Sequence, residues 1–231
     1  MKNIFVVTHT QSVHHVENKV GGWYDTELTP KGRADAQATA EKLVALIGNA
    51  SVEIFSSDLL RASQTAAIIA EHLKSPFETT DGLREISYGS AGGMPQEWLD
   101  ARQIPAPHHD RMDHRGGIAD GETRRELAER VYRALDTIIS RPCPTQIIVT
   151  HGFALTFVIA AWIKMPIDSV GYVSFPASSG SITHLRQDDY WQNRGVIALA
   201  DVSHLKTNPG MTSRGGTLSD PLPQPFNVQP R

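Results

Sequence analysis

The sequence contains one cysteine, almost no excess charge and no long apolar run, and each shortage excludes a class of protein. Because Cys143 is alone among 231 residues, an internal disulfide is impossible and a reducing compartment is expected. The 22 Lys and Arg residues nearly balance the 25 Asp and Glu residues, which argues against nucleic acid or an anionic membrane as partner. The apolar run at residues 3–7 is too short for a signal peptide or a membrane span, so we expect a soluble, cytoplasmic protein.

The chain does contain alternating strand-like and helix-like segments. Strands are expected at residues 3–7, 52–57, 77–80 and 146–150, and an antiparallel pair at residues 170–176 and 180–187. Helices are expected at residues 30–47, 58–73, 120–139 and 153–163. Thr29 can cap the first helix, Pro30 suits its first turn and Gly48 can close it. This alternation predicts an α/β layered fold.

Two segments fall outside the alternation. Residues 100–118 have no clear period, and we expect a long loop there, which can act as a lid. Residues 206–231 hold five prolines and three glycines with little apolar content, which predicts a disordered tail. The chain is therefore divided into one folded domain, residues 1–205, and a Pro/Gly-rich tail.

Several reactive side chains follow the predicted strands. His9 and His151 each come directly after a strand that ends in threonine, Arg61 lies one helical turn beyond the strand end at Ser57, and Glu85 follows the third strand. Ligands of α/β sheets bind beyond the carboxyl ends of the strands, so these groups are expected to converge. Neutral imidazole is a nucleophile, Arg binds phosphoryl oxygens through its planar fork, and a carboxylic acid can protonate a leaving oxygen. This set of residues indicates phosphoryl transfer through a histidine.

Five segments carry a family resemblance over residues 3–186. They read, in chain order, GGWYDTELTPKG, SSDLLRASQTA, LREISYG, DGETRRELAERV and VTHG. Each is modest alone, but their order resembles that of the histidine phosphatase superfamily, also called phosphoglycerate mutase-like. The resemblance implies a three-layer α/β/α sandwich around a mixed, mostly parallel sheet, with residues 1–205 as the catalytic domain.

The resemblance also implies roles for four residues. His9 corresponds to the histidine that becomes phosphorylated, and Arg61 to an arginine that grips the phosphoryl group. Glu85 corresponds to the proton donor, and His151 to the second histidine, which binds the phosphoryl oxygens. Ser12 corresponds to a family serine or threonine that can hydrogen-bond the phosphate.

The first motif departs from the family pattern, which usually reads Arg-His-Gly. Thr8 replaces the arginine, Thr10 replaces the glycine, and His15 stands where many relatives have asparagine. Thr8, Ser12 and His15, together with Arg61 and His151, are the predicted substrate-binding residues. Losing a donor from a preorganised anion site costs about 3 kcal/mol, so a second cation is expected to compensate. The sequence offers three candidates for this compensation: Arg84, Arg111 and Arg115.

Plainer interpretations remain open for some residues. Arg61 can pair with Asp58, Glu85 can pair with Arg84, and Trp23 can be a packing residue at the edge of the site. His14 is expected to be a loop residue with a minor chance of touching substrate. His108, His109 and His114 lack the spacing of a zinc site and have no cysteine beside them, so no metal is predicted.

The sequence therefore predicts a metal-independent phosphomonoester hydrolase that acts on a small phosphorylated substrate through a phosphohistidine and needs no cofactor. A phosphoglycerate-type mutase is the nearest alternative. A non-catalytic module that binds a phospho-ligand or a protein is a third, because the first motif arginine is absent. The sequence leaves the oligomeric state open.

Overall fold

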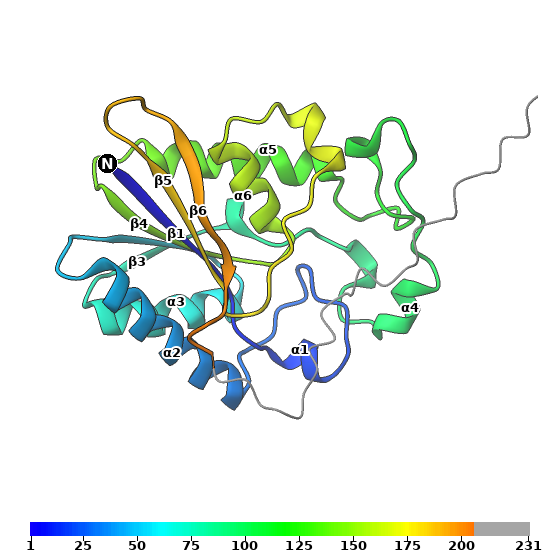
Figure 1. The fold of residues 1–231 in the computed structure, drawn as a ribbon. Coiled ribbons are helices and arrows are strands. Elements are labelled where there is room, and N and C mark those ends of the chain that lie inside the picture. The colour runs from blue at the N-terminus through cyan, green and yellow to red at the C-terminus, as the bar shows by residue number, and fades with distance from the viewer. Residues whose placement is uncertain (206–231) are drawn as a thin grey trace, which may run out of the picture.

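Six strands form one mixed sheet in the computed structural model, which describes residues 1–205 (Figure 1). The strands are β1 (Lys2–Thr8), β2 (Glu53–Ser57), β3 (Phe77–Thr80), β4 (Thr145–Thr150), β5 (Ile182–Gln187) and β6 (Arg194–Asp201), in the order β3-β2-β4-β1-β5-β6. β3, β2, β4 and β1 are parallel, β5 runs antiparallel beside β1, and β6 runs antiparallel beside β5 at the edge of the sheet. The predicted tail, residues 206–231, lies outside the described residues.

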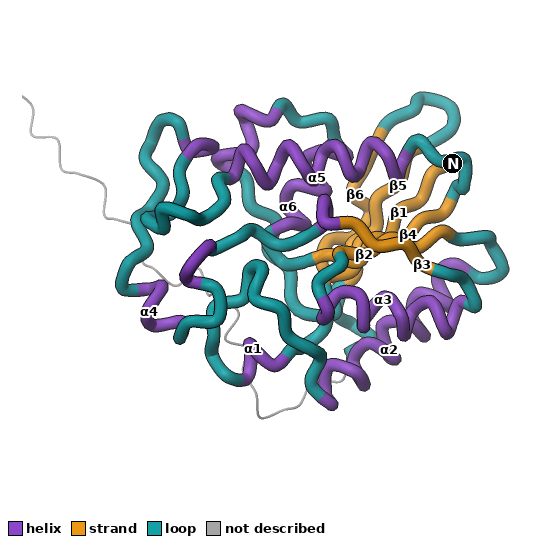
Figure 2. Tube along the Cα trace, turned by 180° about the vertical axis from the view of Figure 1, so that it is seen from behind, coloured by secondary structure: helices purple, strands orange, loops and turns teal. Residues whose placement is uncertain are grey.

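The two faces of the sheet are buried by different helices. Side chains alternate along β1, so Ile4 and Val6 pack into one apolar core and Phe5 and Val7 into the other. Helices α5 (Arg124–Ile139) and α6 (Ala154–Trp162) belong to the first core, and α2 (Pro30–Ile47) and α3 (Leu60–Leu73) to the second. Figures 1 and 2 show the two helix pairs on opposite sides of the sheet. The predicted three-layer α/β/α sandwich is confirmed.

The ends of the helices follow their capping residues. The hydroxyl of Thr29 accepts a hydrogen bond from the Gly32 N–H at 2.9 Å, and α2 ends at Gly48, whose φ is +62°. The helix predicted from residue 120 begins four residues later. The hydroxyl of Thr123 accepts from the N–H of Glu126, and the Glu126 carboxylate accepts from the N–H of Thr123. This reciprocal capping box fixes the start of α5 at Arg124.

The predicted antiparallel pair was wrong in one of its two strands. β5 forms as expected, but its antiparallel partners are β1 and β6. Residues 170–176 contain no strand, and they begin inside the 3₁₀ helix η4 (Ile167–Tyr172). β6 was not predicted because it lies at the sheet edge: four of its eight residues are exposed and none is buried, so it lacks the alternation of a half-buried strand.

Short elements surround the carboxyl ends of the parallel strands. They are α1 (Val13–Val16), α4 (Gln96–Asp100) and the 3₁₀ helices η1 (Asp81–Leu83), η2 (Gly89–Ala91) and η3 (Arg111–Asp113). The predicted loop at residues 100–118 is irregular apart from the end of α4 and η3. Within residues 1–205, none of the helices combines the length and apolar content that crossing a membrane requires.

Candidate active site

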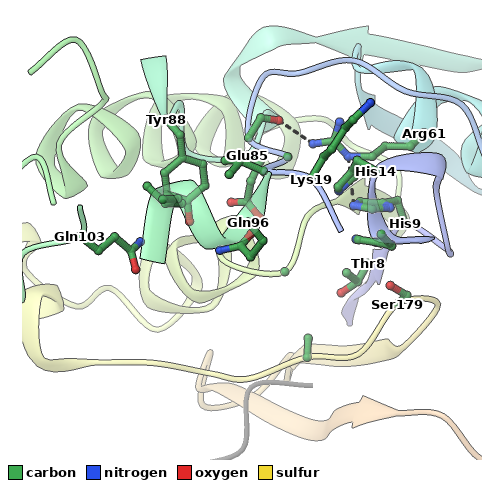
Figure 3. A pocket seen from close by; sticks show the side chains of 17 residues that line it. Thr8, His9, His14, Lys19, Arg61, Glu85, Tyr88, Gln96, Gln103 and Ser179 are labelled. Atoms are coloured by element: carbon green, nitrogen blue, oxygen red, sulfur yellow. Dashed lines mark hydrogen bonds between the residues drawn. The ribbon is translucent and has the colours of Figure 1, made fainter. Parts of the chain in front are cut away.

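A cavity of about 300 Å³ opens where β1 ends, and five of the predicted site residues line it (Figure 3). These residues are Thr8, His9, His15, Arg61 and Glu85. The two remaining predicted residues, Ser12 and His151, are fully buried behind its wall. The ring centroids of His9 and His151 are 4.9 Å apart. The fold therefore brings together the groups that the sequence places at separate strand ends.

The environment of His9 fixes which ring nitrogen can act. Its Nδ1 lies 2.8 Å from the carbonyl oxygen of Thr10, which can only accept, so Nδ1 carries the proton. Nε2 is left with a lone pair, which accepts a hydrogen bond from the Arg61 Nε at 3.2 Å. Burial holds the pKa of His9 well below its usual range, and the charge of Arg61 lowers it further. His9 is therefore a neutral imidazole with its Nε2 lone pair beside an arginine.

Arg61 is the buried cation of the site. Its Nη1 donates to the Tyr24 carbonyl at 3.1 Å, and its Nη2 donates to the Gly22 carbonyl at 2.6 Å. Burial lowers its pKa to about 10, so it stays protonated at neutral pH. The alternative that Arg61 pairs with Asp58 is wrong, because Asp58 binds Arg84 instead. Within residues 1–205, the hydrogen-bond acceptors of the Arg61 guanidinium are therefore the Tyr24 and Gly22 carbonyls and His9.

Glu85 lies at the start of α6. Its carboxylate oxygens accept hydrogen bonds from the N–H groups of Ile86 at 2.9 Å, Phe153 at 3.0 Å and Ala154 at 3.1 Å. Burial raises the pKa of Glu85, although these three donors oppose the rise. Its carboxylate does not pair with Arg84. The site therefore contains a half-buried carboxyl group whose pKa is raised above its usual range.

His151 is held from the opposite side by Ser57. The Ser57 hydroxyl oxygen accepts from the N–H of Leu59 at 3.3 Å and lies 2.9 Å from Nε2 of His151. A hydroxyl can donate to Nε2 or accept from it; when it donates, the ring proton lies on Nδ1. That Nδ1 atom has no partner among the described residues. In that tautomer, His151 has a buried Nδ1–H group without a hydrogen-bond partner within residues 1–205.

The first helical turn after His9 contains two histidines, of which His14 is buried and His15 is exposed. His14, expected in a loop, is buried in α1 and lines the cavity. Its Nδ1 lies 2.8 Å from the Thr26 hydroxyl and 3.1 Å from that of Ser12. Burial lowers the pKa of His14 to about 3 and that of His15 to about 4. Ser12 thus contacts these rings, and its role as a phosphate ligand remains a prediction.

The arginines expected to compensate for Thr8 lie elsewhere. Arg84 forms a two-point ion pair with Asp58, and Arg115 pairs with Glu126 at 2.9 Å. Arg111 lines an adjoining cavity rather than this one. Lys19, which was not among the predicted residues, lines the cavity beside His9. Its Nζ lies 2.7 Å from a carboxylate oxygen of Glu17. A lysine ten residues after His9 carries no recognisable signal in the sequence.

No group of three or more His, Cys, Asp or Glu side chains is placed to hold a metal ion within residues 1–205. His108 is the first of the three loop histidines, and its backbone carbonyl accepts a hydrogen bond from the Tyr172 hydroxyl at 2.7 Å. The ring Nε2 of His114 lies 2.7 Å from the Ile104 carbonyl. The metal independence of the reaction stays a prediction for experiment.

The fold and site define an α/β/α protein with a buried, neutral histidine at the carboxyl end of a central strand. A family model described as the histidine phosphatase superfamily (branch 1) matches residues 4–196. The chain belongs to this superfamily, as the resemblance of its motifs predicted.

Individual relatives have different names. A probable phosphoglycerate mutase, GpmB, of Salmonella arizonae is 28% identical over 216 residues, covering 89% of this chain and 95% of the relative. The structure of Bacillus stearothermophilus YhfR has a TM-score of 0.73 and 28% identity, covering 88% of this chain and 99% of that one. A mycobacterial glucosyl-3-phosphoglycerate phosphatase, solved with inorganic phosphate, has a TM-score of 0.72 at 23% identity, covering 89% and 100%. At 23% identity, the similarity to the mycobacterial phosphatase shows a shared fold and nothing more.

Proposed function

We propose that this protein is a metal-independent phosphomonoester hydrolase that works through a phosphohistidine at Nε2 of His9. The observation that supports it best is the state of His9: a neutral ring, a fixed Nδ1 proton and an Nε2 lone pair facing the cavity beside buried Arg61. Neutral imidazole in this tautomer is the form that attacks phosphorus.

In the first half-reaction, the Nε2 lone pair of His9 attacks phosphorus. The bond between phosphorus and the ester oxygen breaks, and that oxygen takes the proton of Glu85, leaving as an alcohol. Arg61 and the free Nδ1–H of His151 bind the equatorial oxygens, where negative charge is concentrated.

In the second half-reaction, a water molecule attacks the phosphorus of phosphohistidine. Glu85, now a carboxylate, accepts the proton of this water. The N–P bond breaks, its electron pair returns to Nε2 of His9, and inorganic phosphate leaves. Glu85 ends protonated, so the cycle is closed.

Hydrolysis is favoured here over a mutase reaction. A mutase must retain its released intermediate until rephosphorylation, which requires a closed pocket rich in cations. Among the described residues, the Lys and Arg side chains that line this cavity are Arg61 and Lys19. Two of the three guanidinium nitrogens of Arg61 already donate to backbone carbonyls. Beside His9, the cavity therefore offers few cations to hold a second phosphoryl group.

The test is to trap the phosphoenzyme in the presence of excess chelator. Incubation with a labelled aryl phosphate followed by rapid quenching is expected to give protein label that is acid-labile and base-stable. His9→Ala should abolish both label and turnover, while His72→Ala, a substitution at an exposed histidine, should retain them. Label that persists in His9→Ala overturns the proposed nucleophile. Loss of turnover on chelation, restored by a divalent ion, overturns metal independence.

A further inference from the structure

A second cavity of about 510 Å³ adjoins the site of His9. Tyr88, Leu99 and Gln103 line both cavities, and Figure 3 shows Tyr88 and Gln103 at the end of the first cavity away from His9. The volume of the second cavity is in the range of pockets that hold organic ligands. A phosphomonoester bound at His9 therefore has room for its leaving group beyond these residues.

The second cavity combines apolar walls with two arginines. Its apolar lining includes Ile86, Leu99, Ile104, Ile118 and Phe153. Arg111 comes from the irregular loop, Arg124 is the first residue of α5, and both are half-buried. Arg111 lies over the ring of Tyr172 and Arg124 over that of Phe153, with guanidinium carbons 5.1 and 5.2 Å from the centroids.

The two guanidinium groups converge on one oxygen atom. Arg111 Nε donates to the Gly171 carbonyl at 2.8 Å, and Arg124 Nη1 donates to the same oxygen at 2.9 Å. The other acceptors of Arg111 are the carbonyls of Ala106 and Pro107. Neither arginine forms an ion pair with a carboxylate among residues 1–205. Two positive charges thus face each other, and burial together with Arg111 lowers the pKa of Arg124.

Other charged groups around this cavity have partners of their own. Glu122 binds Arg130 through both carboxylate oxygens, and Arg115 binds Glu126. Asp100, at the end of α4, accepts a hydrogen bond from the side chain of Gln96 at 2.8 Å. Of the carboxylates and arginines that line this cavity, Asp100, Arg111 and Arg124 form no ion pair within residues 1–205, so the unpaired charge is positive by one, and its positive part lies at Arg111 and Arg124.

The arginine pair is also held in place. Arg125, next to Arg124, bridges Asp113 of η3 at 2.6 Å and Asp168 of η4 at 2.9 Å. This bridge ties the loop that carries Arg111 to α5 and to the segment that carries Gly171. A preorganised pair of arginines loses little entropy when it binds an anion.

The geometry points to a substrate whose leaving group has an apolar body and a second anionic group, a carboxylate or a phosphate, bound by Arg111 and Arg124. This assignment of the substrate class rests on the proposed hydrolysis at His9. The apolar walls hold the body of the leaving group, and the distal anion relieves the repulsion between the two guanidinium groups.

The test compares three esters with one common body: 3-(4-phosphonooxyphenyl)propanoate, its primary amide, and the analogue with a distal phosphate. The carboxylate or the phosphate ester is expected to exceed the amide about tenfold or more in kcat/KM, as charge-assisted hydrogen bonds imply. Arg124→Met and Arg111→Met should reduce this ratio to about one, and Arg124→Lys should restore part of it. Arg133→Met, an exposed substitution on the same helix, should leave the ratio unchanged.

Equilibrium binding separates the two proposals. The affinities of the corresponding non-hydrolysable phosphonates, measured calorimetrically with wild-type protein, should show the same preference for the distal anion. Equal kcat/KM for the three esters overturns the arginine subsite and leaves the hydrolase intact. No turnover of any ester, with the affinity preference retained, supports the subsite and overturns the hydrolase.

Discussion

At the scale of single residues, hydrogen bonds decide which nitrogen of each histidine is available. The Thr10 carbonyl holds the proton of His9 on Nδ1, and a hydrogen bond donated by the Ser57 hydroxyl to Nε2 would place the proton of His151 on its Nδ1. One ring therefore presents a lone pair and the other presents a donor. These two contacts support the roles proposed for the two histidines, nucleophile for His9 and oxyanion ligand for His151.

Glu85 is predicted to matter most for esters with poor leaving groups. Glu85→Gln keeps a hydrogen-bonding side chain but removes the proton, so kcat for an alkyl phosphate should fall about 10²- to 10⁴-fold. The loss for 4-nitrophenyl phosphate should be much smaller, because this leaving group needs little protonation. The raised pKa of Glu85 also sets the pH dependence: its protonated form is lost as pH rises, so wild-type activity on the alkyl ester should decline toward alkaline pH. Equal losses on both esters would contradict the role of proton donor.

Lys19 is predicted to take over part of the task of the arginine that Thr8 replaces. Lys19→Met should lower kcat/KM about tenfold, because a cation that lines the cavity is lost, and Lys19→Arg should retain activity. Thr8→Arg added to Lys19→Met should restore activity, since the side chain of Thr8 faces the same cavity. Lys31→Met, which removes an exposed lysine on α2, is the matched control. An unchanged kcat/KM in Lys19→Met would show that Lys19 does not compensate for the arginine that Thr8 replaces.

At the scale of elements, α2 determines how the segment after His9 lies. A Cβ atom at Gly32 would lie 2.0 Å from the Gln11 carbonyl oxygen, so the helix can approach this closely only with glycine. The same oxygen accepts from the N–H of Thr29, the residue that caps α2. The contact joins the start of the helix to the backbone two residues beyond the nucleophile.

Gly32→Ala is therefore predicted to destabilise the protein by about 2–4 kcal/mol and to lower kcat/KM, because the clash displaces Gln11. Gly195→Ala is the matched control: its nearest neighbours lie at 3.8 Å or beyond, so the change should be close to neutral. Unfolding in urea and steady-state kinetics measure the two effects. Equal unfolding midpoints for both variants would contradict the close approach.

The sequence alone predicts those elements that show a run of apolar residues, a regular apolar period or recognisable capping residues. β1 and β4 are apolar runs buried on both faces, and α2 begins and ends at its capping residues, so both kinds of element were found. β6 was missed because an edge strand with exposed side chains has no period. The expectation that His14 lies in a loop was wrong because its burial depends on close packing against Gly21, where a Cβ atom would lie 2.7 Å from the His14 Nε2. No local pattern encodes such a contact.

The same limit applies to the candidate site. His9, Arg61, Glu85 and His151 follow strands or lie within motifs, so their convergence could be expected from the topology. The partners of arginine side chains could not, because they depend on where loops return to the domain. Arg111 was expected over the nucleophile, and it lies instead beside Arg124 in the adjoining cavity.

At the scale of the whole molecule, the fold concentrates neutral histidines around one cation. The ring of His9 lies 4.9 Å from that of His151 and 5.5 Å from that of His15, and the ring of His14 lies 4.2 Å from that of His15. Burial and the charge of Arg61 lower the pKa of all four. Two segments of the chain, at the ends of β1 and β4, supply these rings. Protonation of any one of them opposes the folded state.

The free energy of unfolding is accordingly predicted to fall as the pH drops from 7 to 4.5. The unfolded chain takes up protons on its histidines near their ordinary pKa, whereas folded His14 resists protonation down to about pH 3, so acid favours the unfolded state. His14→Gln keeps a group that can hydrogen-bond Thr26 and should reduce the loss over this range by about 2 kcal/mol. His72→Gln, at an exposed position, should leave the pH dependence unchanged. Urea unfolding at both pH values measures the difference, and parallel behaviour of wild type and His14→Gln would show that His14 titrates normally in the folded protein.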